Sequence, residues 1–192
     1  MKLSANLRFS VALLAALVAA PFALGDDGWS EPVPVMNRAK IALTYRAKIA
    51  GDFVIVEANH SKGWHTYSMD NTIRARKATG DEHPESELPT RIAVSGGAKV
   101  SGDWMQTAPV DMSQPSIKWY TWGFEGVARF AAPIERVGDE DIVLTIDAQS
   151  CDPSSCTMVN DLKIILPAMS GDAQPALIDG LVKVQREQDS AS

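Results

Sequence analysis

Short runs in which apolar and polar residues alternate occupy most of the chain. The alternation is clearest at 141–148 and 161–167, where every second side chain is apolar. A period of two places the apolar side chains on one face of a β-strand. Similar runs, separated by glycine, proline and aspartate, occur at 39–47, 53–59, 64–67, 90–94 and 126–134. Many short strands of this kind predict an all-β fold, an antiparallel sandwich or barrel spanning residues 39–168.

Three stretches depart from this pattern. Residues 26–38 are polar and contain two prolines, which predicts an extended leader. Residues 71–88 are charged and poorly periodic, so we expect a surface excursion from the sandwich. In 169–192, Pro175 precedes apolar residues at helical spacing, which predicts a short C-terminal helix followed by a tail.

The first 25 residues have the pattern of a secretory signal peptide. Lys2 and Arg8 are followed by an apolar run and by small residues before Asp26. Pro21 and these small residues favour cleavage over the alternative, an uncleaved N-terminal anchor. No later segment approaches the roughly 18 apolar residues of a membrane helix, so we expect no membrane span in the mature chain. The expected location is periplasmic or secreted.

Charge and length exclude some classes of function. The chain has 18 basic and 24 acidic residues. Removal of the signal peptide takes away two basic residues, so the mature charge is 16 − 24 = −8. An acidic surface disfavours nucleic acid or an anionic membrane as a partner. One domain of this length can bury a core without needing disulfides.

The only two cysteines, Cys151 and Cys156, lie between the strand-like runs 141–148 and 161–167. We expect them at facing ends of two antiparallel neighbours. Their Cys-x4-Cys spacing is not the Cys-x-x-Cys of thioredoxin folds. A structural disulfide is one interpretation, although a loop this short contributes only about 2 kcal/mol. A working dithiol at a strand end is the other, with nearby aspartates disfavouring a free thiolate.

Four motifs resemble, in order, the N-terminal periplasmic domain of the thiol–disulfide interchange protein DsbD. They are GWHTYS (63–68), LPTRIAV (88–94), YTWGFEGVARFAAPI (120–134) and LTIDAQSCDPSSC (144–156). The resemblance covers roughly residues 38–168. It implies an immunoglobulin-like sandwich whose two cysteines cycle between dithiol and disulfide.

The resemblance also implies roles for individual residues. Cys151 and Cys156 would be the catalytic pair, with Cys156 forming the mixed disulfide and Cys151 resolving it. Trp119, Tyr120 and Trp122 would form an aromatic cap over the pair. The implied partners are a thioredoxin-like redox protein and extracytoplasmic thiol proteins, and no cofactor or metal is implied. The sequence contains no membrane electron-conducting domain and no thioredoxin-like domain, so another protein would supply the electrons.

This chain departs from the family after the second cysteine, where Thr157-Met158-Val159 replaces the prolines of many relatives, and in the longer, more charged segment 71–88. Two other functions remain open. One is a non-catalytic sandwich that binds another exported protein and carries a structural disulfide. The other is a copper-handling protein, because thioether and imidazole ligands suit copper. The candidate ligands are His60, His65, Met69, Met105 and Met112, although these residue types also pack commonly in sandwich strands.

Overall fold

The computed structural model shows two antiparallel sheets packed face to face. It describes residues 27–82, 84, 86–168, 172 and 174–187. The all-β fold predicted from the alternation is therefore confirmed, and of the two alternatives, sandwich and barrel, the chain forms the sandwich. Its two-layer antiparallel architecture is that of an immunoglobulin-like sandwich. The expected signal peptide, residues 1–25, lies outside the described residues. Within the described part of the chain, no helix has the length and apolar character needed to cross a membrane.

The first sheet contains seven strands in the order β1-β2-β3-β10-β7-β13, with β6 also paired to β10. Their bounds are β1 Val33–Asn37, β2 Lys40–Ala50, β3 Phe53–His60, β6 Ala98–Val100, β7 Met105–Gln106, β10 Val127–Arg136 and β13 Val182–Lys183. The second sheet has the order β12-β11-β4-β9-β8, with β5 also paired to β11. Its strands are β4 His65–Tyr67, β5 Arg91–Gly96, β8 Val110–Asp111, β9 Trp122–Glu125, β11 Ile142–Asp152 and β12 Ser155–Leu166.

The main core fills the space between the two sheets. Alternate residues of the long strands supply it, as the period of two requires. Phe124 and Phe130 meet edge to face across the layers, with ring centroids 5.5 Å apart. The largest wholly buried apolar side chains of this core are Tyr45, Phe130, Leu43, Ile142, Leu144, Ile146 and Leu166.

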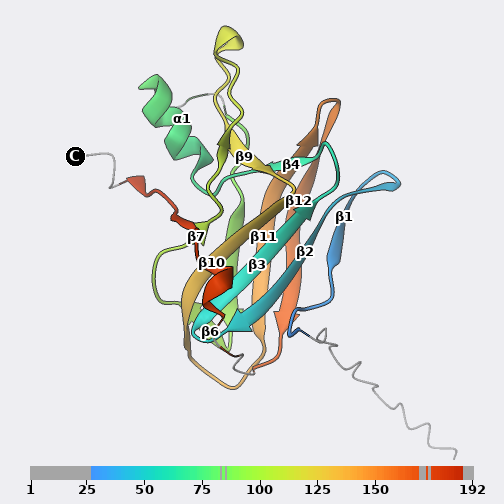
Figure 1. Cartoon of the computed structure of the whole chain (residues 1–192), viewed down its shortest axis with the longest axis vertical. Coiled ribbons are helices and arrows are strands. Elements are labelled where there is room, and N and C mark those ends of the chain that lie inside the picture. Colours follow the sequence, from blue (N-terminus) through green and yellow to red (C-terminus); the bar gives the residue numbers. More distant parts are fainter. Residues whose placement is uncertain (1–26, 83, 85, 169–171, 173, 188–192) are drawn as a thin grey trace, which may run out of the picture.

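One end of the sandwich carries the helix α1, Asn71–Thr79, and the hairpin formed by β8 and β9 (Figure 1). Asp70, just before the helix, has a fully buried side chain that accepts two hydrogen bonds from Arg74, at 2.7 and 3.0 Å. It also accepts one from Gln106 at 2.8 Å. Gly80 ends the helix in the left-handed conformation. The segment 71–88 thus leaves the sandwich as expected, but its first half is helical.

The two terminal segments correct the expected boundaries. The second half of the leader 26–38 forms β1, which pairs with β2, so the sandwich begins before residue 39. The expected C-terminal helix is a single 3₁₀ turn, Pro175–Leu177, and the two-residue strand β13 follows. The helical spacing of these apolar residues does not come from a helix. Leu177 and Leu181 cover the outer face of the first sheet without a continuous helix between them.

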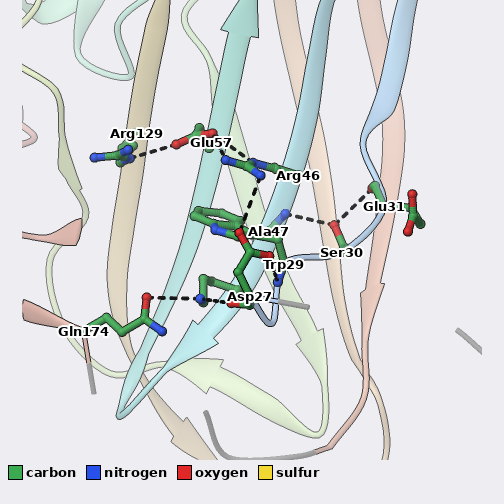
Figure 2. Close-up of polar contacts among 10 residues, drawn as sticks. Asp27, Trp29, Ser30, Glu31, Arg46, Ala47, Glu57, Arg129 and Gln174 are labelled. Carbon is green, nitrogen blue, oxygen red and sulfur yellow. Dashed lines mark hydrogen bonds and ion pairs between the residues drawn. The ribbon is translucent and has the colours of Figure 1, made fainter. Parts of the chain in front are cut away.

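That outer face also holds a charged cluster, drawn in Figure 2. Glu57 of β3 is 5% exposed and accepts hydrogen bonds from Arg46 at 2.7 and 2.9 Å and from Arg129 at 2.9 Å. Trp29 lies under the Arg46 guanidinium, 4.5 Å from it. Because one carboxylate offers several acceptor sites, Glu57 joins β2, β3 and β10 on their exposed side.

Candidate functional site

The two cysteines lie at the tip of the β11–β12 hairpin. Asp152 shapes the tip, because its Oδ1 accepts hydrogen bonds from the backbone N–H groups of Ser154 at 2.8 Å and Ser155 at 2.7 Å. These bonds, that from Ser154 first, lower the pKa of the Asp152 carboxyl. Aspartate and serine at a tight turn form such side-chain to backbone bonds readily. The sequence therefore builds a rigid tip between the cysteines.

Cys151 and Cys156 are paired directly across the hairpin and form a disulfide, with their Cα atoms 4.0 Å apart. The prediction that they lie at facing ends of two antiparallel strands is confirmed. The strands are longer than the alternation indicated, so both cysteines lie within strands and only Pro153 and Ser154 separate β11 from β12.

A β-bulge in β12 decides which way Cys156 points. Leu162 and Ile164 face the core, so unbroken alternation would turn Cys156 inward as well. Ile146 pairs with Leu162 but Ala148 pairs with Val159, so β12 carries one extra residue there. Asp161 has a φ of 52° at this point, and its N–H donates to Asp147 at 2.8 Å. The extra residue shifts the inward–outward alternation of β12 by one position, and this places Cys156 on the outer face.

The disulfide therefore lies on the outer face of the second sheet. On the neighbouring inner positions, Thr66 and Ser150 are fully buried, and Thr66 reaches His60 of the opposite sheet. Cys151 is 3% exposed, whereas Cys156 is exposed. One sulfur-bearing residue is thus covered and the other faces solvent.

Cross-strand neighbours extend the disulfide into a row across the sheet. Cys151 pairs with His65 of β4, which pairs with Glu125 of β9. His65 Nε2 lies 3.1 Å from the hydroxyl of Tyr67. Burial lowers the pKa of His65, although nearby carboxylates oppose this. Burial, together with the charge of Glu87, raises the pKa of Tyr67. At neutral pH the imidazole and the phenol beside Cys151 are therefore uncharged.

The segment 87–88 lies beside Cys151 through contacts with Gln149. The Leu88 N–H donates to Gln149 Oε1 at 3.2 Å, and the Glu87 carboxylate accepts a hydrogen bond from Gln149 Nε2. Gln149 Nε2 is also 3.4 Å from Cys151 Sγ. No pattern in the sequence indicates a role for Glu87, Leu88 or Gln149. Leu88 is 61 residues from Gln149 in the chain, so no local pattern indicates this contact.

The side chain of Asn71 holds the segment 87–88 to the β8–β9 hairpin. It is fully buried at the start of α1. Its Nδ2 donates to the carbonyl of Glu87 at 2.8 Å, and its Oδ1 accepts from Trp122 N–H at 2.7 Å and from Thr121 Oγ1 at 3.2 Å. One amide therefore ties together three segments distant in sequence.

The residues expected to form an aromatic cap lie in the β8–β9 hairpin. Trp119 pairs with Gln114, and Tyr120 lines a hollow together with the end of α1. Trp122 bonds Asn71 through its N–H and accepts from the N–H of Ser68 at 2.9 Å. Figure 1 shows the tip of this hairpin apart from the tip of β11–β12. The cap assignment stays a prediction, and in this structure the contacts described for Cys151 come from β4, Gln149 and Cys156.

The two histidines among the candidate copper ligands lie on opposite sides of the second sheet. His60 donates from Nδ1 to the carbonyl of Gly126 at 2.7 Å, and its Nε2 accepts from Thr66 at 2.8 Å, on the inner side of the sheet. His65 faces the outer side. Met69 packs against the main core, while Met105 packs against the apolar residues on the outer face of the first sheet. Among the described residues, no group of three or more histidine, cysteine, aspartate or glutamate side chains is placed to hold a metal.

Comparison with known proteins finds no matching family model and no matching curated sequence. Among solved structures, the reduced N-terminal domain of DsbD from Neisseria meningitidis is similar, with 14% identity and a TM-score of 0.44, covering 75% of this chain and 91% of that one. A complex between the DsbD and PilB N-terminal domains of the same organism is also similar. There the identity is 10% and the TM-score 0.43, with 79% and 94% of the two chains covered. Both of these structures contain the N-terminal domain of DsbD.

Proposed function

We propose that this chain is an exported thiol–disulfide exchange module, periplasmic or secreted, that uses Cys151 and Cys156 as its redox pair. It passes electrons between a thioredoxin-like donor and extracytoplasmic thiol proteins. The observation that carries the proposal is the asymmetry of the disulfide. Cys156 is exposed at a hairpin tip, whereas Cys151 is buried beside β4.

Exchange requires a thiolate to approach one sulfur in line with the S–S bond. Cys156 is open to such an approach from solvent, so it is the partner-facing sulfur of the proposal. Exposed apolar side chains flank it. Met158 is 46% exposed two residues further along β12, and Leu88 is 50% exposed in the segment 87–88. Leu88 and Met158 line one hollow on this face, and exposed apolar side chains near a reachable sulfur suit transient contact with a partner protein.

The position of the disulfide in the chain means that it contributes little to the stability of the fold. Cys151 and Cys156 are separated by five positions and already face each other in a hydrogen-bonded hairpin. Closing so short a loop contributes roughly 2 kcal/mol on the chain-entropy model. The domain also has a large core of its own. Stability is therefore a weak reason for a disulfide at this place.

The test is a trapping experiment with a thioredoxin-like protein that lacks its resolving cysteine and whose remaining cysteine carries thionitrobenzoate in a mixed disulfide. A thiolate of this chain that attacks that cysteine sulfur displaces thionitrobenzoate, so the trapped disulfide forms without a further oxidant. Cys151→Ala leaves Cys156 free, and we expect this variant to accumulate a mixed disulfide through Cys156. Cys156→Ala should trap much less, because Cys151 is buried. Non-reducing electrophoresis and peptide mapping give the readout.

The reduction potential separates the proposal from its alternative. We expect equilibration with glutathione or thioredoxin to give a potential above about −300 mV. A lower value would mark a structural disulfide. The chain would then be a non-catalytic sandwich that binds another exported protein.

A further inference from the structure

Gln149 lies two residues before Cys151, on the same outer face of β11. Its side-chain amide contacts three groups: the Leu88 N–H, the Glu87 carboxylate and the sulfur of Cys151. Among the described residues, it is the one whose side chain donates a hydrogen bond to a cysteine sulfur. The contact distance from Nε2 to Sγ is 3.4 Å.

The segment 87–88 fixes which way this amide points. A carboxylate only accepts hydrogen bonds, so Glu87 requires the NH₂ end of Gln149 on its side. The Leu88 N–H only donates, so it requires the carbonyl end. The two requirements agree, and they leave the second N–H of the amide directed at Cys151. Asn71 in turn holds the carbonyl of Glu87 in place at 2.8 Å.

We infer that Gln149 stabilises the sulfur of Cys151 as it leaves, and that the segment 87–88 positions the amide for this task. The inference rests on the proposed exchange function. It assigns a role to a polar residue at the site and to the last part of the segment 71–88, which the sequence left without one.

The chemistry shows why a donor is needed at this sulfur. A thiolate of the partner attacks Cys156 Sγ and forms a new S–S bond with it. The Cys151–Cys156 bond breaks, and its electron pair goes to Cys151 Sγ. The partner's second thiol then attacks the mixed disulfide and releases Cys156. Two electrons and two protons have passed from the partner dithiol to the pair, and the partner leaves as a disulfide.

Cys151 must carry the negative charge in the first step, and its surroundings disfavour that charge. The residue is 3% exposed, so water solvates it poorly. The carboxylates of Glu87, Glu125 and Asp152 all act on the adjacent His65, which places negative charge around the row. His65 is uncharged at neutral pH, and its Nε2 faces the Tyr67 hydroxyl. The N–H of Gln149 is the donor that this site offers to the departing sulfur.

The principal test is the rate at which dithiothreitol reduces the oxidised, folded protein. Gln149→Met keeps the length of the side chain and removes the donor. Because a hydrogen bond to a developing charge is lost, we expect reduction about tenfold slower. Thr145→Met places the same side chain on the same face of β11 away from the disulfide, and its rate should equal that of the wild type. Circular dichroism and thermal melting establish that each variant is folded.

Glu87→Gln distinguishes an effect of the Gln149 donor on the rate from an effect of the packing of the segment 87–88. This variant keeps an acceptor for Gln149 and removes a negative charge near Cys151, so its reduction should be as fast as the wild type or faster. If Glu87→Gln slows reduction as much as Gln149→Met does, the effect belongs to the packing of the segment and the inference is wrong. Equal rates for Gln149→Met and the wild type would also overturn it.

A second readout does not depend on opening the disulfide. In a Cys156→Ala background, Cys151 is a single thiol whose alkylation by iodoacetamide can be followed against pH. Gln149→Met should move this profile to higher pH, because the thiolate has lost its donor. An unchanged profile would contradict the inference.

Neither readout uses a protein partner, so the two proposals can fail separately. A Gln149 effect with dithiothreitol, without any exchange with thioredoxin-like proteins, would overturn the proposed function alone. Exchange with such proteins that is insensitive to Gln149→Met would overturn the inference alone. A disulfide that dithiothreitol does not open in the folded protein would overturn both.

Discussion

Replacing Asn71 by alanine should destabilise the protein and release the segments that surround the disulfide. Asn71 is fully buried, and its amide makes hydrogen bonds to Trp122 N–H, Thr121 Oγ1 and the Glu87 carbonyl, at 2.7, 3.2 and 2.8 Å. Alanine makes none of these bonds. The change therefore removes the hydrogen bonds that connect the start of α1 to the β8–β9 hairpin and to the segment 87–88.

The magnitude follows from the three bonds. Each buried partner left without a bond costs about 1 kcal/mol or somewhat more. Three such losses give about 3 kcal/mol. Alanine has the better helix propensity, which offsets up to about 0.7 kcal/mol. We therefore expect the free energy of unfolding to fall by about 2–3 kcal/mol, a large part of the 5–15 kcal/mol typical of a domain.

Urea denaturation of the oxidised protein measures this loss directly. The control is Lys77→Ala, an exposed position in the same helix, which should change stability by less than about 0.5 kcal/mol. Hydrogen exchange adds a local readout. The Trp122 amide should lose protection in Asn71→Ala and keep it in Lys77→Ala, because Asn71 Oδ1 is its acceptor.

Two results would refute this reasoning. One is a loss of stability for Asn71→Ala no larger than that of Lys77→Ala. The other is unchanged exchange at Trp122, which would show that its N–H does not depend on the Asn71 side chain in solution.

Two further predictions concern the first sheet and the response to pH. Glu57→Gln should lower the free energy of unfolding by about 2 kcal/mol, as measured by urea denaturation. The loss is smaller than for a fully buried ion pair because the side chains of Arg46 and Arg129 are each 36% exposed. Unchanged stability would contradict the charged cluster drawn in Figure 2. Burial lowers the pKa of His60, so its contribution to stability should be complete above about pH 6.5 and be lost as the pH falls through the lower folded-state pKa. An NMR titration midpoint for the His60 ring at or above 6.5 would contradict this.

The sequence by itself determined the all-β class and the position of the cysteine pair. The period of two at 141–148 and 161–167 is a local property of each strand, and both segments form strands as expected. Pro153 and the two serines after it indicate a turn from local chemistry alone, so the hairpin around the cysteines was accessible without a structure.

Alternation alone fails where the backbone departs from a regular ladder. Counting by twos from Leu162 turns Cys156 toward the core, and the bulge at Asp161 turns it outward. At the C-terminus, the helical spacing of apolar residues predicted a helix that does not form. Leu177, in a 3₁₀ turn, and Leu181, after the next turn, instead pack on the outer face of the first sheet. In both cases contacts with the rest of the fold select the backbone conformation, and no local pattern contains those contacts.

Only the tertiary structure decided which groups surround the disulfide. The segment 87–88, Gln149 and Cys151 meet because the chain passes Gln149 just before it enters β5, the neighbour of β11, and Asn71 holds the Glu87 carbonyl in place. These segments cover Cys151, which is 3% exposed, whereas the bulge in β12 places Cys156 on the outer face, where it is exposed. Strand patterns are set by neighbours in sequence, whereas the burial of Cys151 involves a segment about 60 residues away in the chain.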